Sequence, residues 1–198
     1  MKKLIYSAFA LAALTLTSAC DKQNTEPAEE PRLYVNTWAV NFNETDDATK
    51  DEWTTFTLNA DGTATIGEVF SQKSLDGFKE DIDTEKLTEE QKALVDGLKE
   101  YDVVGVEGWY SIKANADGSN VLCFVFDSMY NGELERHSIS FHVKDITKDH
   151  MLVFGGFDDK DEPYFCDAYS LETSPMKPGT FYEQKVVSEI PSKEPEYL

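Results

Sequence analysis

The sequence predicts an all-β domain, an eight-stranded antiparallel up-and-down barrel with a helical insertion after the third strand. Eight β-rich runs follow one another between residues 33 and 172, most of them joined by short turns, and one hairpin phrase occurs twice. Short links make consecutive strands antiparallel neighbours, and closing the sheet removes its exposed edges. A two-sheet β-sandwich fits the same strands and is the alternative fold.

The repeated phrase joins a tryptophan to an Asn-Ala-Asp-Gly turn. Trp53 is followed six residues later by Asn59-Ala-Asp-Gly, and Trp109 is followed six residues later by Asn115-Ala-Asp-Gly. Asp-Gly between two β-rich runs is a hairpin signal, because Gly adopts a positive φ at little cost. Each copy therefore predicts a strand, a tight turn and a returning strand.

The eight strands are expected at about 33–43, 52–59, 63–70, 106–114, 119–129, 133–144, 150–157 and 163–172. In the second strand Phe56 and Leu58 alternate with threonines, which is typical of a strand with one buried face. In the third strand Ala64 and Ile66 share one face, and Glu68 lies on that same face.

Between the third and fourth strands the apolar period changes from that of a strand to that of a helix. Leu75 and Phe78 fall at helical spacing, and Thr88 with Gln91 three residues later predicts a capping box. The sequence therefore predicts a helical insertion over 72–101. Its apolar side must cover another part of the molecule.

The chain begins like an exported protein. Lys2 and Lys3 precede an apolar stretch of signal-peptide length that is short for a transmembrane helix. The stretch ends in Thr17-Ser-Ala-Cys20, and these small residues before a cysteine resemble the lipobox of bacterial lipoproteins. The resemblance implies that residues 1–19 are a signal peptide and that Cys20 is acylated. Several acyl chains together give stable membrane anchoring.

The expected organisation follows from this start. Residues 20–31 are the lipidated cysteine and a polar, flexible tether, 32–172 form the barrel domain, and 173–198 are a Pro-rich C-terminal extension. The expected location is the bacterial cell envelope, with the acyl chains in the outer membrane and the domain on its periplasmic or surface face.

The charge balance argues against two classes of partner. The chain has 18 Lys and Arg against 38 Asp and Glu, a formal net charge of −20 at pH 7. Removal of residues 1–19, which hold two Lys and no acidic residue, changes this to −22. Such a chain repels nucleic acid and anionic lipid headgroups.

The start of the domain resembles a known family. Asn36-Thr-Trp38, followed by Phe56-Thr-Leu-Asn-Ala-Asp-Gly-Thr63, is similar to the lipocalin-like lipoproteins common in Bacteroidetes. Those proteins have a Gly-Thr-Trp opening, with Asn36 at the Gly position here, and a later Phe-x-x-x-x-Asp-Gly-Thr hairpin. The resemblance covers about 33–172 and implies a calycin-type barrel.

The leading functional prediction is a barrel that binds a small apolar or amphipathic ligand. Trp38, Trp53 and Trp109 are the candidate aromatic lining, and the alternative is that they pack in the core and close the barrel end. The alternative function is a non-enzymatic envelope protein that binds a partner protein or a glycan through its loops.

Three further residues are candidate modification sites. If Cys20 is acylated, Cys123 and Cys166 remain, and this even number in an exported protein permits a disulfide, with two buried thiols as the alternative. Asp127-Ser128-Met129 resembles the short O-glycosylation acceptor of exported Bacteroidetes proteins, which implies Ser128 as the attachment site.

No pattern of catalytic residues is found. The sequence has no Gly-x-Ser-x-Gly, no phosphate-binding glycine loop and no dinucleotide fingerprint. The three histidines, His137, His142 and His150, lack a further ligand at metal spacing. We therefore predict a protein that is not an enzyme and has no catalytic residue, cofactor or metal.

Overall fold

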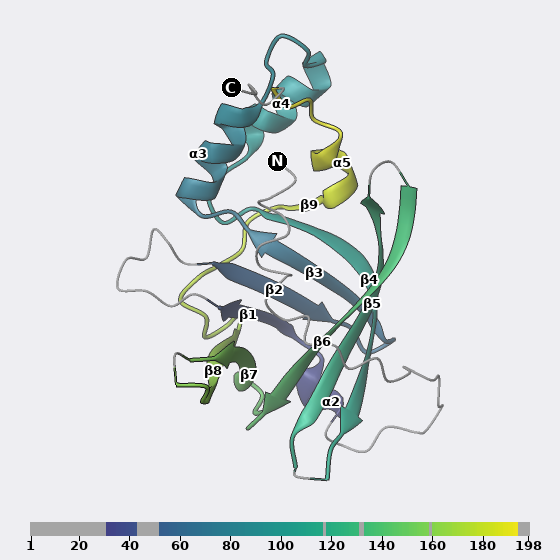
Figure 1. Cartoon of the computed structure of the whole chain (residues 1–198), viewed down its shortest axis with the longest axis vertical. Helices are drawn as coiled ribbons and strands as arrows, with labels where there is room; N and C mark the ends of the chain where they lie inside the picture. Colours follow the sequence, from purple (N-terminus) through teal and green to yellow (C-terminus); the bar gives the residue numbers. More distant parts are fainter. Residues whose placement is uncertain (1–30, 43–51, 117, 131–132, 159, 194–198) are drawn as a thin grey trace.

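The computed structural model describes residues 31–42, 52–116, 118–130, 133–158 and 160–193, and its main body is a closed eight-stranded antiparallel barrel (Figure 1). The barrel strands are Thr37–Asn41 (β1), Trp53–Leu58 (β2), Thr63–Val69 (β3), Val103–Ala114 (β4), Asn120–Tyr130 (β5), Glu133–Lys144 (β6), His150–Phe157 (β7) and Pro163–Ser170 (β8). Each strand pairs with the next in sequence, and β8 pairs with β1. The predicted barrel is confirmed, and the β-sandwich alternative is wrong.

The repeated phrase forms two matching turns. In the first, the Asn59 N–H donates to the carbonyl of Thr63, and in the second the Asn115 N–H donates to the carbonyl of Ser119. The Asn side-chain amide also bonds the hydroxyl four residues later in both turns, at 3.0 Å. Gly62 has a φ of 86°, and the Gly of the second turn has nearly the same value. The hairpin prediction is therefore confirmed at both places.

One end of the barrel is filled and closed. Trp38 is fully buried there, and its indole N–H donates to the carbonyl of Tyr34 at 3.0 Å. Tyr34 ends a short helix, Pro31–Tyr34 (α2), which lies at this end of the barrel (Figure 1). The sequence predicted a strand from residue 33, but Leu33 and Tyr34 are helical. The chain thus turns across the barrel end before it enters β1.

The helical insertion is a separate body beside the opposite end. It holds Gln72–Asp81 (α3) and Glu89–Gly97 (α4), and the predicted capping box of Thr88 and Gln91 is present at the start of α4. At its base, the N–H of Phe70 donates to the carbonyl of Asp102, and the N–H of Tyr101 donates to the carbonyl of Phe70, both at 2.8 Å. The two ends of the insertion are therefore joined directly to each other.

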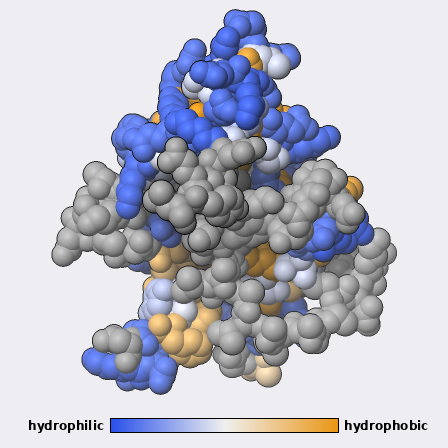
Figure 2. Space-filling model, turned by 45° about the horizontal axis from the view of Figure 1, so that its top comes forward, coloured by the Kyte–Doolittle hydropathy of each residue, from blue (hydrophilic) through white to orange (hydrophobic). Residues whose placement is uncertain are grey.

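The C-terminal segment completes this helical body. After the barrel the chain forms Phe181–Glu183 (β9), which runs parallel to the start of β4, and then Gln184–Ser188 (α5). Val187 and Ile190 pack with Leu75, Phe78 and other apolar residues of the insertion in one buried cluster, the helical cluster. The solvent-facing side of the helices is hydrophilic (Figure 2). The apolar side of the insertion is thus covered by the C-terminal segment.

The stretch between β8 and β9 runs along the outside of the barrel. Its Met176 is buried against Ala39 of β1 and Val103 of β4. Asp102, which is only 3% exposed, fixes the end of this stretch, because its carboxylate accepts the N–H of Thr180 at 2.7 Å and that of Lys99 at 2.9 Å. One carboxylate therefore joins the insertion to the C-terminal segment.

We expect the contact of β3 with β4 to be the most sensitive point of the barrel. Gly67 and Gly105 are paired there. A Cβ on Gly105 would clash with the carbonyl oxygen of Ile66 and would lie 2.6 Å from the Cα of Gly67. Gly105→Ala should lower the free energy of unfolding by roughly 2–4 kcal/mol, measured by urea denaturation with tryptophan fluorescence.

Gly77→Ala is the matched control for this substitution. Gly77 lies inside α3, and a Cβ there meets no atom within 4 Å. This variant should be more stable than the wild type by about 0.5–1 kcal/mol, because Ala is the better helix former. If Gly105→Ala were as stable as the wild type, β3 and β4 could move apart at this point without a loss of folding free energy, and the prediction would be wrong.

Candidate functional site

The barrel interior changes character along its axis. Near its middle, Phe56, Phe124 and Phe141 form a buried aromatic cluster, with ring centroids 4.9–5.9 Å apart. Toward the end that α2 does not close, Phe42, Val106, Phe126 and Ile139 pack against this core but remain partly exposed. We call these four residues the mouth residues. They give the open end an apolar lining above an aromatic floor.

Glu68 is the acidic side chain on the inner face of β3. Ile66, two residues earlier, is a core residue, so the alternation of the strand turns Glu68 to the same side. In the hydrogen-bonded ladder, Glu68 is flanked by Thr54 of β2 and Val104 of β4. Thr54 is 5% exposed, and Val104 packs into the helical cluster. Glu68 therefore lies between the barrel core and the helical cluster.

The surroundings of Glu68 disfavour its charged form. Burial raises the pKa of its carboxyl from 4.5 to about 8, and the nearby charge of Glu52 adds to this rise. The Glu68 carboxyl makes no hydrogen bond or ion pair with any residue that the structure describes. At neutral pH this inward-facing carboxyl is mostly protonated and has a hydrogen-bonding capacity that the described residues leave unused.

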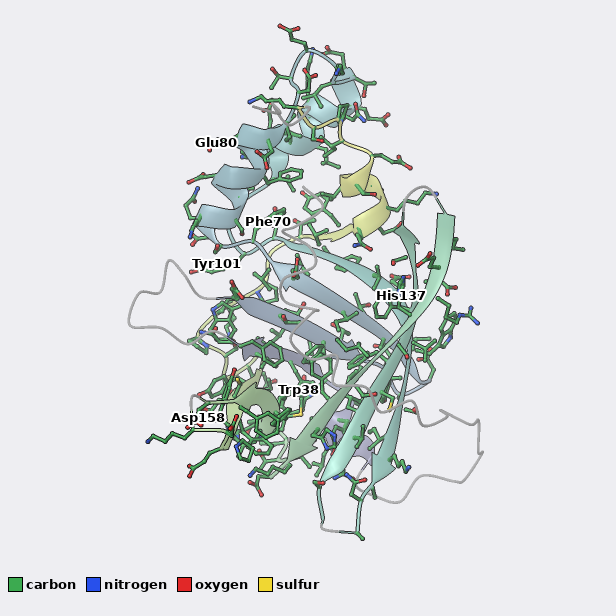
Figure 3. The ribbon with its side chains drawn as sticks, viewed as in Figure 1. Trp38, Phe70, Glu80, Tyr101, His137 and Asp158 are labelled. Carbon is green, nitrogen blue, oxygen red and sulfur yellow. The ribbon has the colours of Figure 1, made fainter. Side chains whose placement is uncertain are left out.

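His137 is a second inward-facing polar residue. It is the ladder partner of Phe126, and the two rings lie 5.7 Å apart. Its Nε2 is buried and has no hydrogen-bond partner among the described residues, although a carboxylate oxygen of Glu135 lies 3.9 Å away. The labels in Figure 3 show His137 on the β5–β6 side of the barrel and Trp38 near α2. The inner wall thus carries polar groups from β3 and β6 among apolar ones.

The structure separates the three tryptophans. Trp38 is on the inner face at the closed end, in the position expected for a residue that closes the barrel. Trp53 packs on the outside of the barrel, against the cluster that Met176 forms with Ala39 and Val103. Trp109 faces outward and is 53% exposed, with the guanidinium of Arg136 5.9 Å from its ring centroid. None of the three belongs to the lining of the open end.

The structure does not join Cys123 to Cys166, so the disulfide that the sequence left open is not formed. Cys123 is on the outer face of β5 and Cys166 on the inner face of β8, with β6 and β7 between them. Ser128 is on the inner face of β5 near its end, and it is partly buried. Cys20 lies outside the described residues, so its acylation stays a prediction.

The histidines are spread over both faces of the sheet. His142 faces outward, 6.3 Å from the ring of Phe154, and His150 bonds Asp167 at 2.6 Å on the outer side of β7 and β8. Within the described ranges, no group of three or more His, Cys, Asp or Glu side chains could hold a metal ion.

Sequence reasoning placed Glu68 correctly but gave it no role. Strand alternation alone put it on the face of Ala64 and Ile66, and that is where it lies. The sequence does not predict the mouth residues, because alternation predicts which face of a strand is inward but not how deep each position lies in a tilted barrel. An acidic residue within an apolar strand face was the available signal.

The pKa of Glu68 predicts a pH-dependent stability. The folded state keeps the proton up to about pH 8 and the unfolded state loses it near 4.5, so the contribution of Glu68 is largest at low pH and is lost as pH rises toward 8. Glu68→Gln should therefore be more stable than the wild type at pH 8, by on the order of 3–5 kcal/mol, with a difference near zero at pH 4.5. Glu107→Gln, on the exposed outer face of β4, should leave the pH profile of unfolding unchanged.

Neither a protein-family model, nor a curated protein, nor a solved structure matches this chain. In the part of the chain that the structure describes, no helix has the length and apolar character needed to cross a membrane. We therefore infer the function from the geometry of the barrel and from the chemistry of its open end.

Proposed function

We propose that this protein is a lipid-anchored, lipocalin-like lipoprotein that binds a small apolar or amphipathic molecule in the open end of its barrel. The observation that carries the proposal is the position of the mouth residues, which are apolar, pack against the aromatic cluster and remain partly exposed at the end opposite α2. One end is closed by Trp38 and α2, while the mouth residues at the other end are apolar and still partly exposed. Apolar side chains that stay partly exposed on the inner face of a barrel favour an apolar ligand.

The aromatic floor limits the size of the ligand. Phe56, Phe124 and Phe141 fill the middle of the barrel, so a ligand would occupy the upper part and leave the closed end unchanged. Small barrels of eight strands can hold one small ligand in this way. Glu68 and His137 would supply the few polar contacts that fix its orientation, as in most small-molecule sites.

The first experiment is native mass spectrometry with solvent extraction of the protein purified from its own envelope. A small molecule that co-purifies at close to one per chain supports the proposal and identifies the ligand class. An empty mass, with no thermal shift across fatty acids, haem, bile acids and sugars, contradicts it.

Ile139→Trp should block the mouth. Ile139 faces inward on β6, and its neighbour Ser138 faces outward and is exposed. The larger ring should lower the affinity for an apolar fluorophore at least tenfold, because it fills the space that the ligand needs, whereas Ser138→Trp should change it less than twofold. The measurement is a fluorescence titration, and circular dichroism checks that both variants fold.

The proposed membrane anchoring depends on Cys20. Cys20→Ala should abolish incorporation of labelled palmitate and release the protein from the membrane fraction, because the thiol is the first point of acylation. Cys123→Ala keeps the lipobox resemblance intact and should label as the wild type does. Palmitate labelling of Cys20→Ala at the wild-type level would contradict the anchoring proposal.

A second candidate function is binding of an envelope protein or glycan by the outer surface. Phe154, Phe157 and Phe165 form an outward aromatic group on β7 and β8, with ring centroids 5.3–5.8 Å apart, and Phe157 is 53% exposed. Lys144 lies 3.7 Å over the ring of Phe165. Exposed aromatic groups of this kind are typical of interaction surfaces. If native mass spectrometry finds no co-purifying small molecule and no compound shifts the melting temperature, this second candidate is favoured.

A further inference from the structure

We infer that the ligand of the open end carries an ammonium group and that Glu68 is its counter-ion. The inference rests on the proposed function and names the chemical class of its ligand: an amphipathic amine, with the apolar part against the mouth residues and the cationic end at the inner face of β3. An ordinary fatty acid or an uncharged lipid does not meet this requirement.

The position of Glu68 carries the argument. The side chain is fixed by the strand itself, because Thr54 and Val104 flank it in the ladder, and both are tied to buried parts of the protein. It is turned into the barrel, above the core residue Ile66 and below Phe70, which packs in the helical cluster. Within the described ranges nothing bonds to it. Glu68 is partly buried. Partial burial of an acidic group with no partner is costly, and a bound cation removes that cost.

The charges around Glu68 also favour a cation. On the β2 side the nearby charged residue is Glu52, which is also acidic. On the β4 side the neighbouring residues, Val104 and Val106, are apolar. Tyr182 of β9 faces the helical cluster, and His137 lies on the β6 part of the inner wall. Among the described residues no Lys or Arg forms an ion pair with Glu68, and the whole chain has a net charge of −20. The field at the mouth therefore attracts a cation and repels a carboxylate.

The aromatic part of the lining suits the same ligand. Phe42 stacks on Phe141 with ring centroids 5.8 Å apart, and Phe126 lies opposite on β5. Aromatic faces attract alkylammonium groups as well as alkyl chains. A molecule with one ammonium group and one hydrocarbon chain satisfies the carboxyl and the apolar wall together.

Binding of an amine should depend on pH in a defined direction. In the empty barrel Glu68 holds its proton up to about pH 8, and it must release this proton when an ammonium ion binds. Affinity should therefore rise about tenfold per pH unit between pH 6 and 7.5 and level off above 8. Alkylamines have pKa values near that of Lys, about 10.4, and stay cationic over this range. The affinity of an uncharged analogue should be independent of pH.

The test compares octylamine, octanol and octanoate, which share one alkyl chain and differ in charge. The protein is the chain from residue 20 with Cys20→Ala, the form that processing would leave without lipid, and it keeps every described element. Calorimetric titration at pH 8 should give octylamine at least tenfold tighter binding than octanol, and octanoate the weakest. The preference should survive higher salt, because a buried pair is screened little.

Two matched variants locate the effect. Glu68→Gln keeps the shape of the side chain, and it should reduce the octylamine preference to about one while octanol binds as before. Glu107→Gln removes the same charge from the outer face of β4 and should bind all three compounds as the wild type does. A loss of preference in both variants would assign the effect to net charge and overturn the inference.

The remaining outcomes separate this inference from the proposed function. If octanol and octylamine bind equally in the wild type, the barrel is a ligand-binding site and the role of Glu68 is overturned. The same conclusion follows if Glu68→Gln keeps the amine preference or if octanoate binds best. If none of the three compounds binds, the proposed function fails, and the inference fails with it.

Discussion

The barrel depends on the pairing of β3 with β4. These two strands are separated in sequence by the whole helical insertion, yet they form a ladder of seven residue pairs, from Thr63 with Trp109 to Val69 with Val103. Gly67 and Gly105 allow the close approach within that ladder. Because the hydrogen bonds of Phe70 with Tyr101 and Asp102 close the base of the insertion, the helices do not interrupt the sheet. The helical insertion thus leaves and re-enters the sheet at one point, between β3 and β4.

The helical insertion is stabilised by the C-terminal segment, which contains β9 and α5. The insertion alone has two short helices with one apolar side, which is too little surface to form a stable core. β9 and α5 provide the missing half, and the amide of Gln91 bonds the carbonyl of Glu189 at 3.2 Å. Val104, the ladder partner of Glu68, packs against this cluster, so the helical cluster borders the part of the barrel that holds Glu68. Burial in this part of the barrel raises the pKa of the Glu68 carboxyl, and the charge of Glu52 adds to the rise.

Much of the fold could be predicted from local sequence patterns, and the failures have clear physical reasons. The Asp-Gly turns and the capping box at Thr88 are set by a few neighbouring residues, so the sequence predicted both. The start of β4 at Val103, before the predicted residue 106, depends on pairing with β3 and β9. Tyr34 has strong β propensity but lies in α2, because its buried carbonyl and ring contribute to the closed end. Tertiary contacts override propensity in both cases.

The candidate site was less predictable than the fold. Alternation placed Glu68 inside, but its isolation depends on residues from β2, β4 and the helical cluster that no local pattern connects. The tryptophans are the opposite case, because the sequence predicts all three as candidate lining residues while only Trp38 faces the interior. In a closed barrel, depth along the axis decides whether an inward residue packs in the core or meets a ligand. Depth follows from the stagger of all eight strands.

The pairing of β1 with β8 has a consequence for how the protein is made. Trp38 lies beside Ser170, its partner from the opposite end of the barrel sequence, so the ring of strands cannot close until nearly the entire chain has been synthesised. Long-range pairings of this kind slow folding, because much chain entropy is lost before the contacts form. The polypeptide therefore remains open for most of its synthesis. Under the export that we propose, this open chain is the form that crosses the membrane, and closure of the barrel on the far side prevents its return.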